Sequence, residues 1–363
     1  MSSIWGEQIK ISIFGGSHTE AVGVTIDGLP AGESISMDEV LLQMARRAPG
    51  QDATATARKE SDTPRVLCGL LDGVTTGAPL TAIIENSNQH SKDYSDLKVH
   101  PRPGHADYPA FVKFCGHNDI RGGGHFSGRL TAPLVFAGAV ARQILARKGI
   151  LVASHITSIE NVGGGDIDPV NPDMVLLTRL SREYFPVADE SAKESMRKVI
   201  EKARSEQDSV GGTVECFVTG LPAGVGGLLF GGVEPVFSSL LFAIPAVKGV
   251  DFGAGFSSAY LRGSENNDAF YINENGTVKT RTNRCGGILG GITTGMPLVF
   301  QVAFKPTPSI GKEQETVDLL TGESYRLSVQ GRHDPCIVPR AAPVVEAAAA
   351  VAVLELMARS GLL

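Results

Sequence analysis

The sequence predicts an α+β fold, and two observations carry this prediction. Strand-like segments follow one another along the 363-residue chain without the strict alternation of strand and helix that a doubly wound sheet requires. Two short motifs also recur in the same order: DGLPAG at residues 27–32 returns as TGLPAG at 219–224, and GVTTGAPL at 73–80 returns as GITTGMPL at 291–298. Two matches in register indicate an internal duplication.

The first copy begins with two strands and a helix that has a clear start signal. Residues 10–14 (KISIF) and 23–26 are predicted strands, and the Leu-Pro-Ala-Gly turn follows them. Ser36 is the predicted N-cap of the helix formed by SMDEVLLQMARRA. Residues 65–68 and 80–85 complete this copy as further strands.

The second copy repeats this order of elements. It is predicted to contain a strand at residues 214–218, the same turn, a helix at 233–247, and strands at 287–292 and 298–304. We expect these last two strands to correspond to the last two strands of the first copy.

Two further helices and two loops are predicted outside these elements. Residues 131–148 form a helix with a proline near its start and Gly149 after its end. Residues 192–206 form a charged amphipathic helix. Loops are predicted at 163–165 and 275–284.

The chain is expected to form one interlocked domain rather than two. Its length allows either arrangement, but no low-complexity linker separates the two copies. The domain therefore covers residues 1–363, with the repeats at about 10–130 and 210–310.

Composition and charge exclude several classes of protein. The formal net charge of -6 argues against a surface devoted to nucleic acid or anionic lipid. The five cysteines are scattered and form no C-x-x-C pair, as expected for reduced thiols in a cytoplasmic protein. The N-terminus MSSIWGEQIK has no signal-peptide pattern. The apolar segments 132–146 and 344–357 are too short and too charged to span a bilayer, and are predicted to be buried helices.

One stretch concentrates positive charge against this acidic background. Residues 98–129 hold five Lys or Arg and two Asp, and the stretch ends in RGGGHFSGR. Consecutive glycines are tolerated where the backbone needs positive φ or approaches a ligand closely. With Arg121 and Arg129 on either side and His125 within, this segment is predicted to bind a small anion such as a phosphate. Chance clustering of charge and a plain flexible turn are the alternatives.

Other candidate residues lie in turns far apart in the sequence. Ser17 and His18 follow the first strand, His105 follows a Pro-Gly turn, and QGRHDPC contains Arg332 and Asp334. Several such turns on an otherwise apolar chain indicate one shared site. His117, by contrast, is interpreted as structural. Further positive charge comes from Arg46, Arg47, Lys305 and Arg340, although Arg46 could simply complement the dipole at the end of its helix.

A family resemblance rests on eight motifs that occur in order between residues 11 and 355: FGGSH, RRAPG, RPGHADY, RGGGHFSGR, AVKGVDFG, GGILGGITTG, KPTPS and GRHDPC. In this series the sequence resembles the chorismate synthase family over essentially its whole length. The resemblance implies a βαβ sandwich of antiparallel sheets and helices, assembled as a homotetramer. It also implies trans-1,4-elimination of phosphate from 5-enolpyruvylshikimate 3-phosphate to give chorismate, dependent on reduced FMN (FMNH2). NADPH is expected only as an indirect reductant, because no reductase-like insertion is present.

The same resemblance implies roles for individual residues. His18 is expected beside the departing phosphate as a general acid, and His105 is expected to stabilise or protonate the reduced flavin. Asp334 is expected next to flavin N5, where it assists removal of the C6 hydrogen. The implied anion-binding arginines and hydrogen-bonding serines are Arg47, Arg129, Arg332, Arg340, Ser17 and Ser127. The implied flavin contacts are His125, Phe126, Ser127, Pro245, Ala246, Gly290, Lys305, Pro306, Thr307, Pro308, Ser309 and Arg332.

The sequence also departs from the family pattern. Ala48 and Ala53 stand at usual arginine positions, His125 begins the usual Arg-Ser-Ser segment, and Pro245 stands at a usual asparagine. We expect the fold and reaction to persist, with altered contacts at the enolpyruvyl carboxylate and the flavin phosphate. Arg58 is a candidate to replace part of the missing charge.

Two other hypotheses belong to different functional classes. A metal-dependent phosphohydrolase would use His18, His105, His125 and Asp334 as ligands, but the chain lacks the HxH, HExxH or carboxylate-rich spacing typical of such sites, and no metal is expected. A non-catalytic flavin-binding protein would bind the cofactor without turnover.

Overall fold

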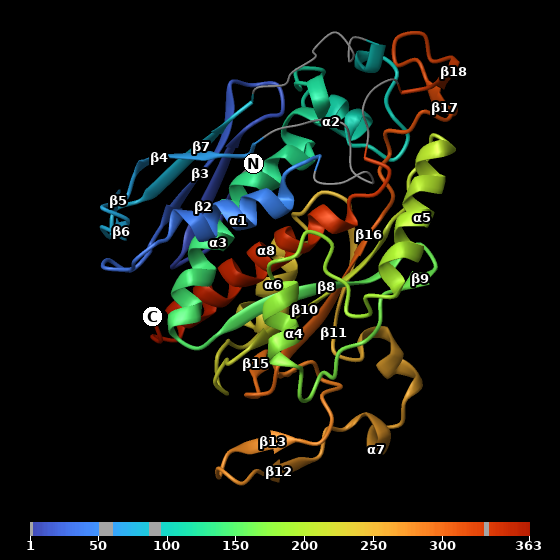
Figure 1. Ribbon diagram of the computed structural model, residues 1–363. Coiled ribbons are helices and arrows are strands. Elements are labelled where there is room, and N and C mark those ends of the chain that lie inside the picture. Colours follow the sequence, from blue (N-terminus) through green and yellow to red (C-terminus); the bar gives the residue numbers. More distant parts are fainter. Residues whose placement is uncertain (1–2, 51–60, 87–95, 330–333) are drawn as a thin grey trace.

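Two antiparallel β-sheets enclose a layer of helices (Figure 1). The structure is a computed structural model, and it describes residues 3–50, 61–86, 96–329 and 334–363. The first sheet has the strand order β1-β2-β3-β7-β4, the second has the order β11-β16-β10-β8-β9, and all neighbouring strands pair antiparallel. The predicted α+β fold is confirmed.

The strands have the following bounds. The first sheet contains β1 (Ile4–Trp5), β2 (Lys10–Gly15), β3 (Ala21–Asp27), β7 (Leu80–Glu85) and β4 (Pro64–Cys68). The second contains β11 (Val247–Phe252), β16 (Leu298–Phe304), β10 (Gly212–Thr219), β8 (Leu151–Ile159) and β9 (Val162–Gly163). Four small hairpins are β5 (Leu70–Leu71) with β6 (Val74–Thr75), β12 (Phe270–Ile272) with β13 (Val278–Thr280), β14 (Ile288–Leu289) with β15 (Ile292–Thr293), and β17 (Gln314–Val317) with β18 (Ser324–Leu327).

Four helices form the layer between the sheets: α1 (Met37–Arg47), α3 (Thr131–Arg147), α6 (Val233–Leu241) and α8 (Val338–Arg359). α3 packs along α8; α3 also contacts β3 of the first sheet, and α8 contacts β8 and β10 of the second. The remaining helices are α2 (Asp107–Lys113), α4 (Met174–Leu180), α5 (Ala192–Ser205) and α7 (Gly263–Asn266). α4 and α5 cover the outer side of the second sheet at β8.

The predicted start of α1 is confirmed in atomic detail. The Ser36 side chain accepts a hydrogen bond from the main-chain N–H of Glu39, which satisfies one of the unpaired donors of the first turn. Asp38 and Glu39 lie in that turn, and Arg46 and Arg47 lie in the last turn, so both ends complement the helix dipole. This capping fixes where α1 begins, and the helix runs from there to the two arginines in its last turn.

α8 is a long apolar helix, and its surroundings explain why. It is long and apolar enough to cross a membrane by composition, but 94% of its apolar window is buried inside the protein. The helix lies in the core between the two sheets, where apolar residues on every side have something to pack against. This confirms that residues 344–357 form a buried helix.

The repeated motifs occupy matching places in the two sheets. Thr75 Oγ1 donates to the Pro30 carbonyl (2.6 Å) and accepts from the Glu33 N–H (2.9 Å). Thr293 Oγ1 donates to the Pro222 carbonyl (2.7 Å) and accepts from the Val225 N–H (2.9 Å). The central strands also correspond, because β3 and β4 flank β7 as β10 and β11 flank β16. We propose the internal duplication within a single domain on these matched contacts.

Several predicted element boundaries in the second copy are wrong. The helix predicted at 233–247 ends at Leu241, because Pro245 lacks the N–H that a helix needs and Ala246 takes a left-handed φ of 74°. The strand predicted at 287–292 is the β14–β15 hairpin, which Gly290 and Gly291 turn with positive φ. The true counterpart of β4 is therefore β11. The loop predicted at 275–284 contains β13, and the loop at 163–165 begins inside β9.

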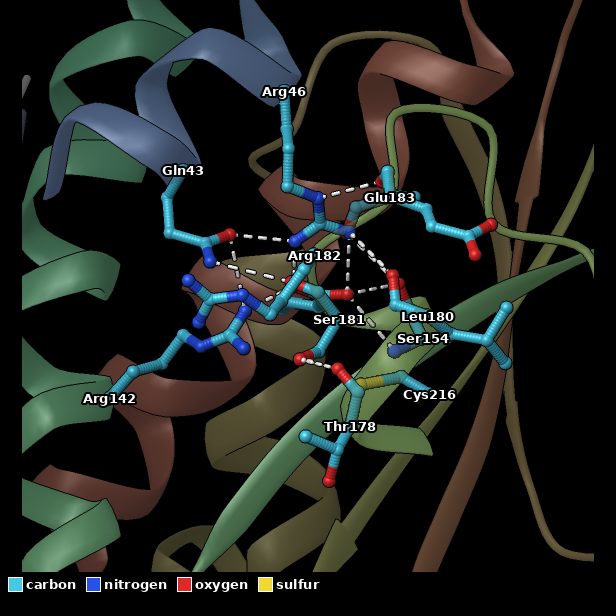
Figure 2. Close-up of polar contacts among 12 residues, drawn as sticks. Gln43, Arg46, Arg142, Ser154, Thr178, Leu180, Ser181, Arg182, Glu183 and Cys216 are labelled. Carbon is cyan, nitrogen blue, oxygen red and sulfur yellow. Dashed lines mark hydrogen bonds and ion pairs between the residues drawn. The ribbon is translucent and has the colours of Figure 1, made fainter. Parts of the chain in front are cut away.

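A buried charge cluster joins α1, α3 and α8 to the second sheet. Figure 2 shows Arg46 reaching toward Gln43 and the main chain at Leu180 and Glu183, with Arg142 and Ser154 beside it. Arg46 donates from both terminal nitrogens to Glu346 (2.6 and 3.0 Å), and Arg142 donates to the same carboxylate. Ser154 donates two more hydrogen bonds to Glu346, from its N–H and its hydroxyl. Arg46 therefore does more than complement a helix dipole: it pairs inside the core.

Candidate active site

A cavity of about 600 Å³ opens between elements from both halves of the chain. From the first half of the chain, its wall includes the end of α1, the loop before α2, part of the glycine loop at residues 122–124 with the residues after it, and the start of α3. From the second half it includes the α6–β11 connection, the residues after β16 and the start of α8. Six Lys or Arg side chains and, among the described residues, one carboxylate lie in this wall. The cations are Arg47, Arg102, Arg129, Lys248, Lys305 and Arg340, and the carboxylate is Asp334. Such a wall selects anionic ligands.

The glycine loop separates two candidate histidines. Gly122, Gly123 and Gly124 all have positive φ, at 57°, 86° and 52°. A Cβ on Gly122 would lie 2.4 Å from His18 Cε1, and a Cβ on Gly123 would lie 3.2 Å from His105 Nε2. The main chain of the loop therefore passes between the two imidazole rings. At position 122 it comes so close to His18 that only glycine fits.

His18 lies behind this loop rather than in the cavity wall. Its Nδ1 is 3.1 Å from Ser17 Oγ, and Ser17 Oγ donates to the Arg121 carbonyl at 2.9 Å. Both side chains are buried. His18 instead borders a separate open hollow, together with Glu20, Arg65 and other residues at the edge of the first sheet. It would reach a ligand in the main cavity only past Gly122.

Asp62 holds two of the cavity arginines in place. One carboxylate oxygen accepts from Arg47 at 2.6 Å, and the other accepts from Arg129. The Arg47 guanidinium also donates to Thr131 Oγ1 (3.0 Å) and the Gly128 carbonyl (2.8 Å), so all three of its nitrogens are engaged. Burial opposes the charge of Asp62, but the two arginines outweigh burial and hold its pKa below the usual value.

The positive charge around Arg47 is dense enough to affect its own ionisation. Burial, together with the charges of Arg340 and Arg129, lowers the pKa of Arg47 to about 10 despite Asp62. Arg47 stays charged at neutral pH. An incoming anion would relieve the repulsion among the three arginines, which favours anion binding at this place.

Asp334 and Arg340 form a second ion pair in the cavity wall, next to the end of α1. Arg340 donates to the Asp334 carboxylate and, through Nε, to the main-chain carbonyl of Arg47 at 3.0 Å. The Thr307 hydroxyl donates to the Asp334 carbonyl at 2.9 Å. These bonds connect the start of α8 to the end of α1 and to the loop after β16.

A third arginine–carboxylate pair includes His105. Asp107 accepts from Arg102 at both oxygens, at 2.7 and 2.8 Å, and its Oδ1 lies 2.6 Å from His105 Nδ1. Arg102 also donates to Ser309 Oγ at 3.1 Å. Burial opposes ionisation of Asp107, but its bonds to Arg102 and His105 hold its pKa well below the usual range.

Comparison with known proteins decides the family. The family model described as chorismate synthase matches residues 9–358. The chain belongs to the chorismate synthase family. A chorismate synthase of Thermococcus gammatolerans is 48% identical over 354 residues, covering 98% of this chain and 97% of that protein. One of Dehalococcoides mccartyi is 44% identical over 363 residues, covering 100% of this chain and 98% of that protein.

A solved structure confirms the fold. A crystal structure of chorismate synthase superimposes with a TM-score of 0.76 at 24% identity, and covers 98% of this chain and 93% of that chain. The family predicted from the sequence motifs is confirmed, and with it the lyase class of the enzyme and its place in aromatic biosynthesis.

Most residues that the chorismate synthase resemblance implies for the flavin or substrate come together in the cavity. The wall contains Arg47, His105, His125, Phe126, Ser127, Arg129, Pro245, Ala246, Lys305, Thr307, Pro308, Ser309, Asp334 and Arg340. Their roles stay predictions, since proximity alone assigns none.

The other implied residues lie elsewhere. Ser17 and His18 lie behind the glycine loop, and Pro306 is not part of the wall although its neighbours are. Gly290 lies on the β14–β15 hairpin, away from the wall. Arg332 lies outside the described residues, so nothing places it relative to the cavity.

Three of the four residues that differ from the chorismate synthase pattern lie in the described part of the chain. Ala48 is the buried C-cap residue of α1, directly after Arg47. His125 lies within hydrogen-bonding distance of the Ser3 hydroxyl (2.9 Å) and the Gly15 carbonyl (3.1 Å), so its ring is bound to the first sheet. Pro245 lies in the cavity wall. Ala53 and Arg58 lie outside the described residues.

Sequence reasoning missed Asp62, Arg102, Asp107 and Lys248. Asp62 gave no signal, because its partners lie 15 and 67 residues away along the chain. Arg102 and Asp107 stand inside the RPGHADY motif and could have been found as a charge pair around His105. Among the described residues, no group of three or more His, Cys, Asp or Glu side chains could hold a metal ion.

Proposed function

We propose that this chain converts 5-enolpyruvylshikimate 3-phosphate to chorismate and phosphate, with reduced FMN as cofactor. The observation that carries the proposal is the cavity itself. Motifs spread over more than 280 residues, from Arg47 to Arg340, meet around one space with six cations in its wall. The substrate has two carboxylates and a phosphate, and the flavin adds another phosphate, so the ligands supply the charge that this wall lacks.

The arginine set is suited to bind the substrate anions. Arg47, Arg129 and Arg340 are already oriented by Asp62 and Asp334, so little side-chain freedom is lost when an anion arrives. Planar guanidinium groups can engage two oxygens of a carboxylate or phosphate at once. We assign these three residues to substrate binding, and include Arg332 on the family pattern alone.

A flavin fits the remaining wall by size and by chemistry. The volume lies within the range of about 300–1,000 Å³ that is usual for small-molecule sites. Phe126, Pro245 and Ala246 offer an apolar surface for a flat ring. Burial and the charge of Lys248 lower the pKa of Lys305, so these two lysines would gain from a phosphate nearby. Further flavin contacts are proposed at His125, Ser127, Thr307, Pro308 and Ser309.

The elimination requires loss of the C6 proton and cleavage of the bond from C3 to the phosphate oxygen. When bound, reduced FMN would supply electron density that helps the phosphate leave. The residues of this chain would do the rest: the arginines would balance the charge of the leaving phosphate, and His18 would protonate it past Gly122, from behind the glycine loop. We assign His105 to hold a proton that it could exchange beside the flavin, and Asp334 to assist removal of the C6 proton, because both line the cavity. No net oxidation occurs.

We also propose a reducing cytoplasm as the location of the enzyme, and a homotetramer as its assembly. The five cysteines are all free, which agrees with a reducing cytoplasm. A homotetramer and an external source of reduced flavin, with NADPH acting indirectly, follow the family pattern.

One anaerobic experiment tests the proposal. The purified protein is incubated with 5-enolpyruvylshikimate 3-phosphate and photoreduced FMN, and both phosphate and chorismate are followed; oxidised FMN is the control. Equal amounts of the two products, only with reduced flavin, are expected. Phosphate release without chorismate would point to a hydrolase instead, and metal analysis of the same sample would identify its ion. Flavin binding without either product would leave a non-catalytic flavoprotein.

A further inference from the structure

Asp107 is a buried member of a three-residue cluster with Arg102 and His105. It is the first residue of α2, and its side chain is 5% exposed. Its Oδ2 accepts from the main-chain N–H of Arg102 (3.0 Å) and from Arg102 Nε (2.7 Å). Its Oδ1 accepts from Arg102 Nη2 (2.8 Å) and lies 2.6 Å from His105 Nδ1. A carboxylate with this many bonds has no freedom to rotate.

The short contact fixes where the histidine proton must be. Asp107 is ionised at neutral pH, because its bonds to Arg102 and His105 outweigh its burial and keep its pKa well below the usual range. An ionised carboxylate can only accept hydrogen bonds. Two lone pairs would repel each other at 2.6 Å, so His105 Nδ1 must carry a proton.

The other ring nitrogen of His105 is then the one that can exchange a proton. In the neutral ring, a proton on Nδ1 leaves a lone pair on Nε2. Nε2 lies 3.2 Å from the position that a Cβ of Gly123 would take, on the side of the glycine loop. His105 and Gly122 both lie in the wall of the cavity. Because Gly123 has no side chain, nothing from that residue covers Nε2 on the side of the glycine loop.

Arg102 completes the arrangement from the other side of the ring. Its Nη2 lies 3.0 Å from His105 Nδ1 and 3.3 Å from Nε2, and its Nη1 donates to Ser309 Oγ. Since Nδ1 already donates to Asp107, Arg102 cannot donate to that nitrogen, and only Nε2 can accept from Nη2, at the longer distance of 3.3 Å. Arg102 therefore acts on Asp107, which it orients, and on the imidazole through its charge.

We propose that Asp107 is a positioning residue of this active site, which holds the proton of His105 on Nδ1 and thereby presents Nε2 to the bound ligand. The inference rests on the proposed function for the role of His105 in proton exchange. The same logic operates wherever a buried carboxylate selects the tautomer of a catalytic histidine. Asp107 itself touches no ligand; it acts through His105.

The first test measures the tautomer directly, in the protein without cofactor or substrate. Histidine labelled with nitrogen-15 is incorporated, and spectra are recorded in alkaline buffer, where histidine rings are neutral. His105→Gln identifies the signals of His105 among the eight histidines by their loss. We expect a proton on Nδ1 in the native chain. A proton on Nε2 would overturn the inference, whatever the activity of the enzyme.

The second test replaces the carboxylate by an amide of the same shape. In Asp107→Asn the amide can donate to Nδ1, which would move the ring proton to Nε2. We expect that change in the spectrum, together with a fall in kcat of about 100-fold, the scale of general acid–base catalysis, and a KM changed by less than about threefold. If His105 in this variant kept the tautomer and the enzyme kept the kcat of the native protein, the inference would also be overturned.

Two further variants separate positioning from stability. Asp107→Glu keeps the charge and should restore the Nδ1 tautomer and part of kcat. Asp208→Asn is the matched control, because Asp208 pairs with Lys312 (2.8 Å) outside the cavity wall, and it should leave tautomer, kcat and KM unchanged. If Asp107→Asn does not fold, the tautomer of the native chain still decides. If the native protein makes no chorismate, the proposed function fails, but the spectrum still tests the role of Asp107.

Discussion

Arg46 and Arg47 are neighbours in the sequence, yet they belong to two different charge clusters. The core cluster consists of Arg46, Arg142 and Glu346, and the cavity cluster consists of Arg47, Arg129 and Asp62. Each has one carboxylate buried between two arginines. The two clusters differ in their surroundings. Ser154 and main-chain carbonyls surround the core cluster, whereas the cavity cluster lies next to Arg340 and the open cavity.

This comparison shows that one electrostatic unit can serve two purposes. In the core cluster the Arg46 donors that do not reach Glu346 are taken up by Gln43 and main-chain carbonyls, so fixed partners close the cluster and it holds α1, α3 and α8 to the second sheet. In the cavity cluster Arg47 and Arg129 line an open space, and the neighbouring charge of Arg340 repels Arg47, so the unit is complete only when an anion binds. Its carboxylate serves to orient the arginines before the ligand arrives.

The largest effect is expected when the core cluster loses its carboxylate charge. Glu346→Gln leaves Arg46 and Arg142 buried without a counter-charge, and breaking such a buried pair costs about 3–5 kcal/mol. Urea unfolding should show this loss of unfolding free energy. Glu33→Gln is the control, because its pair with Arg147 is partly exposed at the surface, where such pairs are worth about 0–1 kcal/mol. Equal stability of the two variants would contradict a structural role for the core cluster.

The matched substitutions Arg46→Lys and Arg47→Lys should separate the two clusters most directly. A lysine cannot replace the several directed bonds of a guanidinium, and a lost bond to a charged group costs about 1.5–3 kcal/mol. For Arg47→Lys that cost should appear as a fall in kcat/KM of roughly 10- to 100-fold. For Arg46→Lys it should appear in unfolding free energy, with kcat/KM of the folded enzyme little changed. The reverse pattern would mean that the assignment of the clusters is wrong.

The same dipeptide shows what could be predicted from the sequence. The N-cap at Ser36 and the helix up to the two arginines follow from local signals, and motif order was enough to identify the family. The partners of the arginines did not follow, because Glu346 lies 300 residues from Arg46 and Asp62 lies in a segment without periodicity. Local signals also failed at 287–292, where two glycines turn an expected strand into a hairpin. Sequence patterns record local conformation, whereas pairing depends on the finished fold.

A smaller effect is expected from Gly122→Ala. A left-handed φ costs an alanine about 1–2 kcal/mol, and the new methyl group would also stand 2.4 Å from Ser17 Oγ and His18 Cε1. We expect lower unfolding free energy and reduced kcat, because His18 must move. Gly263→Ala is the control, since nothing lies within 4 Å of its Cβ position and its φ is not positive. A Gly122→Ala enzyme with native kcat would exclude His18 from the reaction.

Acid pH should weaken both clusters, because protonation of their carboxylates is linked to unfolding. The two clusters should differ in whether acid pH also changes anion affinity. The pKa values of Asp62 and Glu346 both lie below their ordinary values of 3.8 and 4.5, because the paired arginines outweigh the burial that opposes ionisation. Below those ordinary values the unfolded chain takes up protons that the folded carboxylates do not, so stability falls as the pH decreases.

Each carboxylate accounts for at most one proton in this linkage, or about 1.4 kcal/mol for each pH unit. Glu346→Gln and Asp62→Asn should therefore each reduce the dependence of unfolding free energy on pH below about pH 4.5, measured by urea unfolding at successive pH values. Only Asp62→Asn should also change the pH dependence of anion affinity, measured with inorganic phosphate. The reason is that its carboxylate lies next to arginines that face the cavity, whereas Glu346 is closed off by Ser154. Equal changes in phosphate affinity would mean that the two clusters are electrostatically coupled through α1.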